Sequence, residues 1–292
     1  MGVLATVAAA ASVPAKLLSG GLDVSTGVLI PENRLGGGVA MAELSSEEGG
    51  TGPPDGDLPL DVRQRLHDQM PFALPVIAIV PVVIAVILAS TLAPVRAGAA
   101  ALGAAGWLVA IALRVPAIAF VLRMPKLNTP KIMAPFLALI SGPVEELIRL
   151  LLVLFGVKGF GSVLWAGFGW AAIEVVYTLV NALVLRRLLL DTSASAAGAR
   201  RLLVSMGILQ YVQCLVPLLG AVERAGVSLL HIGFTLLLGW NPWLMLLTMP
   251  THSATNLCAV RLIKKRSVIL METIVVAVGA TAFALGLLAW QH

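Results

Sequence analysis

Charged residues are scarce in this sequence. Asp, Glu, Lys and Arg make up only 12% of its 292 residues, whereas 59% are hydrophobic. The charged share is about half that of an ordinary soluble domain, and the mean hydropathy is +0.96. This composition excludes a water-soluble globular protein and predicts an integral, multi-pass membrane protein.

Cysteine is nearly absent. Cys214 and Cys258 lie in apolar segments and lack the C-x-x-C spacing of redox and zinc motifs. The sequence also contains no H-E-x-x-H, the helical motif of many zinc peptidases. The net charge of +5 comes from Lys and Arg in short stretches between apolar runs, without interleaved aromatic residues. These features exclude a disulfide framework and give no indication of a nucleic-acid partner.

Apolar segments fill the chain from residue 71 onward, and a helix needs about 20 residues to cross a membrane. We predict an all-α polytopic transmembrane bundle over residues 71–292, with eight spans. These are residues 72–93, 98–122, 132–155, 162–185, 202–219, 225–238, 243–263 and 268–290. The fifth segment is polar for a span, so seven spans, with this segment at the membrane surface, are the alternative. Residues 1–70, rich in Gly, Ala and Ser, are expected to form a flexible lead.

Ionisable residues inside four of these spans are the main functional signal. Glu145 and Glu146 are adjacent in the third span, and Glu174, His231 and His252 each lie well inside a later span. Ionised groups are costly in hydrocarbon, so inside a membrane they mark functional sites. At about 1.5 Å per residue, the five residues fall at similar depth. We therefore expect them to meet in one buried site.

Two arginines and an asparagine are expected to support these residues. Arg149 follows Glu145 by four residues and is expected to neutralise that carboxylate. Asn256 follows His252 by the same spacing, so its amide could orient the imidazole or bind a substrate carbonyl. Arg114, inside the second span, is expected to find a carboxylate or the membrane interface.

Small residues and a second charged pair lie in the same region. Gly167 and Gly169 precede Glu174 and predict a close approach of helices around the site. Glu223 and Arg224 stand at the head of the sixth predicted span, where we interpret them as an interfacial ion pair. The tryptophans are interpreted as anchors at the membrane surface.

The predicted group of residues suits hydrolysis of a carbonyl compound. A buried glutamate can take a proton from water, while His, Asn or a bound cation stabilises the oxyanion that forms. Glu145, His231 and His252 are also residue types that hold zinc. A divalent metal is therefore a candidate cofactor, which the sequence does not establish.

Four segments, in order, resemble the motifs of a known family. They are residues 145–149, 167–174, 223–234 and 252–256. These segments are similar to the four motifs of the YhfC-type intramembrane metalloproteases. That family belongs to a superfamily with the type II CAAX prenyl endopeptidases, the PrsW proteases and the anterior-pharynx-defective subunit of γ-secretase. The resemblance covers roughly residues 133–262, within a motif-bearing core at 132–263.

The resemblance implies roles for individual residues. Glu145 would activate water, supported by Glu146 and Arg149, and His252 with Asn256 would stabilise the oxyanion. One position departs from the prenyl endopeptidases, because Glu174 stands where they carry a histidine, as it does in PrsW-like proteins. This departure argues against processing of CAAX tails.

We therefore predict an intramembrane endopeptidase that cleaves a membrane-embedded or membrane-proximal protein or peptide with a glutamate-activated water. Two other classes stay open. One is a non-catalytic scaffold subunit of a protease complex. The other is a proton- or ion-coupled transporter with Glu145, Glu174 and the histidines as a relay, although we detect no inverted repeats. The bilayer is an expected partner, and the sequence leaves the oligomeric state open.

Overall fold

The computed structural model describes residues 57–124, 130–205, 217–265 and 267–291. These residues contain eight α-helices and no strand, which confirms the all-α prediction. The helices are α3 (Leu60–Thr91), α4 (Ala97–Arg123), α5 (Pro130–Leu151), α6 (Phe160–Leu190), α7 (Ala194–Ser205), α9 (Pro217–Trp240), α10 (Met245–Lys264) and α11 (Val268–Ala289). A π-helical turn (Leu152–Gly156) extends α5, and a 3-10 turn (Pro242–Leu244) joins α9 to α10.

Five of the described helices are long and apolar enough to cross a membrane. They are α3, α4 up to Phe120, α6, α9 and α11. Helices α5 and α10, with 22 and 20 residues, also have the length of a crossing, but they carry many of the polar residues described below. The chain is thus a helical membrane protein, and the number of spans stays a prediction. Most of the predicted fifth span lies outside the described residues.

Helix α3 begins inside the segment that we expected to be a flexible lead. Residues 60–70 are helical, and Leu66 and Met70 are buried against Leu137 of α5 and Leu189 of α6. The prediction for this part of the lead is wrong, because its polar residues share helical turns with apolar ones that pack on the bundle. Residues 1–56 lie outside the described part of the chain.

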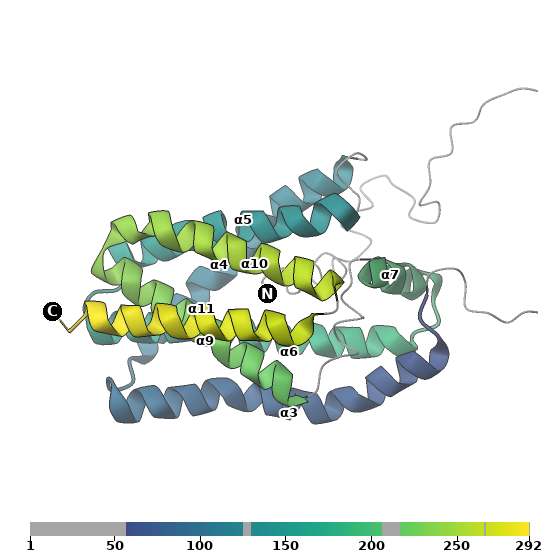
Figure 1. Ribbon diagram of the computed structural model, residues 1–292, viewed down its shortest axis with the longest axis horizontal. Helices are drawn as coiled ribbons and strands as arrows, with labels where there is room; N and C mark the ends of the chain where they lie inside the picture. The colour runs from purple at the N-terminus through teal and green to yellow at the C-terminus, as the bar shows by residue number, and fades with distance from the viewer. Residues whose placement is uncertain (1–56, 125–129, 206–216, 266, 292) are drawn as a thin grey trace, which may run out of the picture.

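Helix α9 is the centre of the bundle. In its most apolar stretch 78% of the residues are buried, against 33% or less in the other four candidate spans of the described residues. Figure 1 shows α5 and α10 along one edge of the bundle and α3 along the opposite edge, with α9 and α11 between them. Helices α6 and α9 pack antiparallel, since Val163 meets Gly239 whereas Thr178 meets Arg224.

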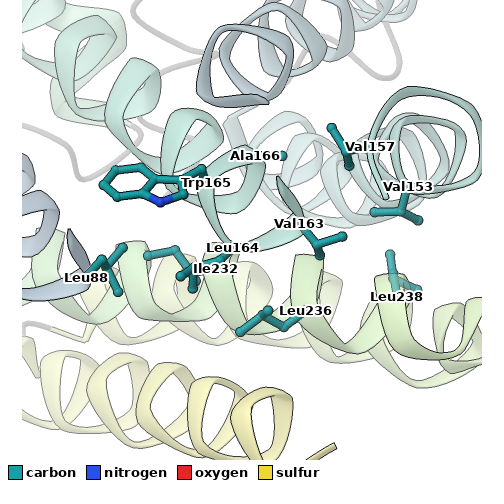
Figure 2. Packing of buried hydrophobic residues seen from close by; sticks show 10 residues of the cluster. All are labelled: Leu88, Val153, Val157, Val163, Leu164, Trp165, Ala166, Ile232, Leu236 and Leu238. Carbon is teal, nitrogen blue, oxygen red and sulfur yellow. The ribbon is translucent and has the colours of Figure 1, made fainter. Parts of the chain in front are cut away.

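The largest apolar cluster joins α3, α6 and α9. Figure 2 shows Leu88 of α3 and Leu164 and Trp165 of α6 close to Ile232 and Leu236 of α9. Lipid tails are as apolar as these side chains, so burial from water does not drive such contacts inside a membrane. Van der Waals packing therefore has to hold the helices together, and it depends on close approach.

Glycines allow the closest approaches between helices. A Cβ at Gly103 of α4 would lie 1.9 Å from the carbonyl oxygen of Ala166 of α6. A Cβ at Gly169 of α6 would lie 1.9 Å from the carbonyl oxygen of Ala100 of α4. Gly167 makes a similar approach to the backbone of α9. The predicted role of Gly167 and Gly169 in close helix contact is confirmed.

A buried ion pair joins Asp57, just before α3, to Arg200 of α7. Arg200 of α7 donates hydrogen bonds to both carboxylate oxygens of Asp57, from Nε at 2.9 Å and from Nη2 at 2.7 Å. The same guanidinium also donates to the carbonyl oxygens of Leu188 and Asp191. The hydrogen bonds from Arg200 hold the pKa of the Asp57 carboxyl below its usual value.

The contact between α4 and α6 can be tested with two alanine substitutions in α4. Gly103→Ala should lower the free energy of unfolding by about 1–3 kcal/mol, because the new methyl group overlaps backbone atoms. Gly98→Ala is the control, since a Cβ at Gly98 meets nothing within 4 Å. The unfolding temperatures of Gly103→Ala and Gly98→Ala would be measured in the same detergent. Equal unfolding temperatures would contradict the packing described for α4 and α6.

The Asp57–Arg200 pair predicts a pH-dependent stability. Because folding lowers the pKa of Asp57, its carboxylate stabilises the fold above the unfolded-state pKa of about 3.9, and this contribution is lost as the pH falls through the folded-state pKa. Asp57→Asn should therefore unfold at a lower temperature at neutral pH, with a smaller difference from wild type in acid. Asp61→Asn, which alters an exposed aspartate of α3, is the control. A difference that stays constant with pH would contradict the assignment.

Candidate functional site

The ionisable residues predicted inside the membrane come together in the structure. Glu145 and Glu146 lie on α5, Glu174 on α6, His231 on α9 and His252 on α10, and each is 4% exposed or less. The hydrogen bonds described below connect all four helices and bring α4 into the same group. The prediction that these residues meet at one buried place is confirmed.

Glu145 is held by groups from two other helices. Its Oε1 accepts a hydrogen bond from Nη2 of Arg114 of α4 at 2.7 Å, and its Oε2 accepts one from Nε1 of Trp170 of α6 at 3.3 Å. Nε2 of His252 lies 3.9 Å from Oε1, which is too long for a direct hydrogen bond. Glu145 is thus oriented from α4 and α6 while it faces α10. The prediction that Arg114 finds a carboxylate is confirmed.

Arg149 pairs with Glu146 and not with Glu145, so that prediction is wrong. Its Nη1 donates to Oε1 of Glu146 at 2.9 Å. Residues three and four apart are both neighbours on a helix surface, so the spacing alone does not select the partner. Glu145 is already neutralised by Arg114. Beside Glu146, the Arg149 side chain also contacts His231, with 2.8 Å between Nη2 of Arg149 and Nδ1 of His231.

Glu174 joins α6 to α9. Its Oε2 lies 2.6 Å from Nε2 of His231, and its Oε1 accepts a hydrogen bond from Nη1 of Arg224 at 3.5 Å. Arg224 also pairs with the adjacent Glu223, and both are buried. We predicted this pair at the head of its helix, but α9 begins six residues earlier, at Pro217, and both side chains are buried among the helices of the bundle.

His252 and Asn256 lie on one face of α10 and contact α5. Nδ1 of His252 lies 2.8 Å from Oε1 of Glu146, and Nδ2 of Asn256 donates to Oγ of Ser141 at 2.6 Å. Sequence reasoning missed Ser141. Its position four residues before Glu145 places both on one helix face, and this spacing could have identified it.

Trp170 is a further residue of the site that the sequence prediction missed. Its side chain is fully buried, it donates to Glu145, and its ring lies under the guanidinium of Arg149, 4.6 Å from Cζ to the ring centroid. The interpretation of the tryptophans as surface anchors is therefore wrong for this residue. Trp170 precedes Glu174 by four residues, so the helix period places both on one face.

A comparison of the chain with protein-family models, with curated proteins and with solved structures found no match. The resemblance to the YhfC-type family therefore remains an expectation from the sequence.

Three residues of the site have the character of metal ligands. The ligand atoms of Glu145, Glu174 and His231 lie within 4.8 Å of one another, so by donor type and spacing they could hold a metal ion. Glu174 here takes the place that we predicted for His252. Both ring nitrogens of His231, however, are engaged by Glu174 and Arg149. A metal ion at either nitrogen would have to replace one of these contacts.

The Arg114–Glu145 pair predicts a strong dependence of stability on both partners. Arg114→Met should lower the free energy of unfolding by about 3–5 kcal/mol, because it leaves a buried carboxylate without its partner. The double variant Arg114→Met/Glu145→Leu should recover most of this loss, since an apolar pair of similar volume replaces a buried ion pair at little cost. Thermal unfolding in detergent would measure the stability of the single variant and of the double variant.

The matched control for this pair is Arg96→Met. Arg96 is exposed and donates to Ser162 on the surface of the bundle. Its replacement should change the unfolding temperature little. A double variant as unstable as Arg114→Met alone would show that the two residues are not coupled as the 2.7 Å contact indicates.

Proposed function

We propose that the protein is an intramembrane endopeptidase, similar to the YhfC-type family, in which Glu145 activates water. One observation carries this proposal. Oε1 of Glu145 and Nε2 of His252 face each other at 3.9 Å inside a buried site. This separation exceeds a hydrogen bond but lets one water molecule donate a hydrogen to each atom.

The chemistry proposed for this water is amide hydrolysis. As Glu145 takes one proton, the water oxygen attacks the carbonyl carbon of a peptide bond, and the π electron pair moves onto the carbonyl oxygen. When the carbonyl re-forms, the bond from carbon to nitrogen breaks. The proton on Glu145 then passes to the leaving nitrogen, so one water and one peptide bond give an acid and an amine.

The neighbouring residues prepare this step. Arg114 and Trp170 donate to Glu145 and fix the direction of its carboxylate. We assign His252 and Asn256, on one face of α10, to stabilise the oxyanion. His252 takes the second proton of the attacking water, donates it to the oxyanion as a hydrogen bond, and returns it when the carbonyl re-forms. Buried hydrogen-bond donors are stronger here than in water, because the surroundings have a low dielectric.

The proposed substrate is a membrane-embedded or membrane-proximal protein or peptide. The residues of the site lie inside helices of membrane-crossing length: Glu145 comes 15 residues after the start of α5, and His252 comes 7 residues after the start of α10. A peptide bond that reaches them therefore has to come from within the bilayer or from its surface. Zinc is not part of this proposal, because both ring nitrogens of His231 are engaged.

A proton- or ion-coupled transporter is the second candidate, and a specific observation favours it. A continuous series of polar contacts runs through the bundle, in the order Glu223, Arg224, Glu174, His231, Arg149, Glu146 and His252. Such a series could relay protons between helices. A transporter would show flux that depends on a pH gradient in proteoliposomes, whereas a peptidase would generate new peptide termini.

The peptidase proposal predicts loss of cleavage in Glu145→Gln and in His252→Ala. Membranes that contain the wild type or a variant would be incubated, and the new amino termini of membrane proteins identified by mass spectrometry. The rate at which these termini appear should fall at least about 100-fold in both variants, because a general base and an oxyanion donor are removed.

The control is Glu272→Gln, which changes another buried glutamate, on α11, by the same single atom. It should cleave like the wild type at equal protein level. Cleavage that survives Glu145→Gln would exclude the peptidase proposal. A function that persists in all three variants would instead indicate the scaffold subunit.

A further inference from the structure

The hydrogen-bond partners of the two histidines decide where each imidazole carries its proton. A neutral imidazole has one N–H, which donates, and one nitrogen lone pair, which accepts. A guanidinium only donates, and an ionised carboxylate only accepts. A ring nitrogen beside an arginine must therefore be the acceptor, and a ring nitrogen beside an ionised carboxylate must carry the hydrogen.

His231 has a partner of each kind. Nη2 of Arg149 lies 2.8 Å from Nδ1, so Nδ1 accepts. The hydrogen of the neutral ring is then on Nε2, which donates to Oε2 of Glu174 at 2.6 Å. A second proton on Nδ1 would face the N–H of Arg149, so this contact also keeps His231 neutral.

His252 has the opposite arrangement. Its Nδ1 lies 2.8 Å from Oε1 of Glu146, an oxygen that also accepts from Nη1 of Arg149 at 2.9 Å. As the carboxylate partner of an arginine, Glu146 is ionised and accepts both hydrogen bonds. Nδ1 of His252 therefore carries the hydrogen, and Nε2 has the lone pair that faces Glu145.

We propose that Arg149 is a positioning residue that sets opposite tautomers on the two histidines, with Nε2–H on His231 and Nδ1–H on His252. One guanidinium acts on both rings, directly on His231 and through Glu146 on His252. The aromatic rings of Trp170 and Phe234 flank it, with centroids 4.6 Å and 5.9 Å from Cζ. Stacking of this kind restricts the plane of the guanidinium fork.

The contact between Arg149 and His231 also affects whether His231 can bind a metal ion. A histidine that binds a metal usually donates its other N–H to a carboxylate or carbonyl oxygen. Arg149 presents a donor at Nδ1 of His231, where a metal-bound ring would need an acceptor. Arg149 thus keeps His231 from coordinating a metal, although Glu145 and Glu174 lie close enough to join it.

The assignment also separates the roles of the two rings. His231 cannot gain a proton without losing its contact with Arg149, whereas His252 can gain one at Nε2. His252 is therefore the ring that can accept a proton from water and then donate to an oxyanion. Only this last step rests on the proposed function, because the tautomers follow from the hydrogen bonds alone.

The experiment is nitrogen NMR of the full chain, labelled with ¹⁵N-histidine in detergent micelles and purified through a tag free of histidine. His67→Gln and His292→Gln reduce the signals to the two rings of interest. Spectra are recorded at an alkaline pH, where both rings are neutral. We expect one ring protonated at Nε2 and the other at Nδ1, and His252→Asn identifies which is which. Two rings of the same tautomer, or the reverse assignment, would overturn the proposal.

The role of Arg149 is tested by a variant with a matched control. In Arg149→Met the Nε2–H tautomer of His231 should give way to a mixture, whereas Arg96→Met, which removes an exposed arginine outside the site, should leave it unchanged. An unchanged His231 in Arg149→Met would overturn the role of Arg149. If Arg149→Met does not fold, Arg149→Gln replaces it, because a side-chain amide can accept as well as donate and so no longer requires Nδ1 of His231 to be the acceptor.

Zinc provides a second readout that needs no substrate. Added zinc should leave the His231 signals of the wild type unchanged, and Arg149→Met should bind zinc at least about tenfold more tightly. A zinc-dependent shift of His231 in the wild type would overturn the proposal. Because neither measurement depends on cleavage, their outcome is separate from that of the proposed peptidase activity.

Discussion

The pairing of buried carboxylates with guanidinium groups is the constraint on which the rest of this structure depends. Glu145, Glu146 and Glu174 lie inside the bundle, and arginines on α4, α5 and α9 contact them. An unpaired charge at this depth costs several kcal/mol. The two pairs that join helices, Arg114 with Glu145 and Arg224 with Glu174, can form only in an arrangement that places α4 beside α5 and α9 beside α6. They therefore restrict the fold to that arrangement, which apolar packing against lipid-like surroundings does not select by itself.

Small residues set the distances at which the polar groups meet. A Cβ at Gly142 of α5 would lie 2.1 Å from Oγ of Ser253 of α10, so only glycine permits this approach. One turn further along α5, the same approach brings Glu146 within 2.8 Å of His252. The packing of Gly142 on Ser253 and the pairing of Glu146 with His252 thus depend on the same close approach of α5 and α10.

The sequence predicted the helices and the meeting of the ionisable residues, because hydropathy and depth along a helix are local properties. It did not predict which groups pair. Arg149 can reach three or four residues back with equal ease, and the choice of Glu146 depends on Arg114 and His231, which are distant in the sequence. The burial of Arg224 likewise depends on how far α9 is enclosed by other helices. Such choices are made by tertiary contacts, which no single helix encodes.

The asymmetry between the two histidines favours a reactive site over a structural one. A network that served only to hold helices would engage both ring nitrogens of each imidazole, as the contacts of His231 do. His252 is held firmly at Nδ1, whereas its Nε2 faces Glu145 across 3.9 Å. An acceptor nitrogen and a carboxylate oxygen at this separation do not stabilise each other directly. They are both well placed to act on a small polar molecule between them, which is the requirement for activating water.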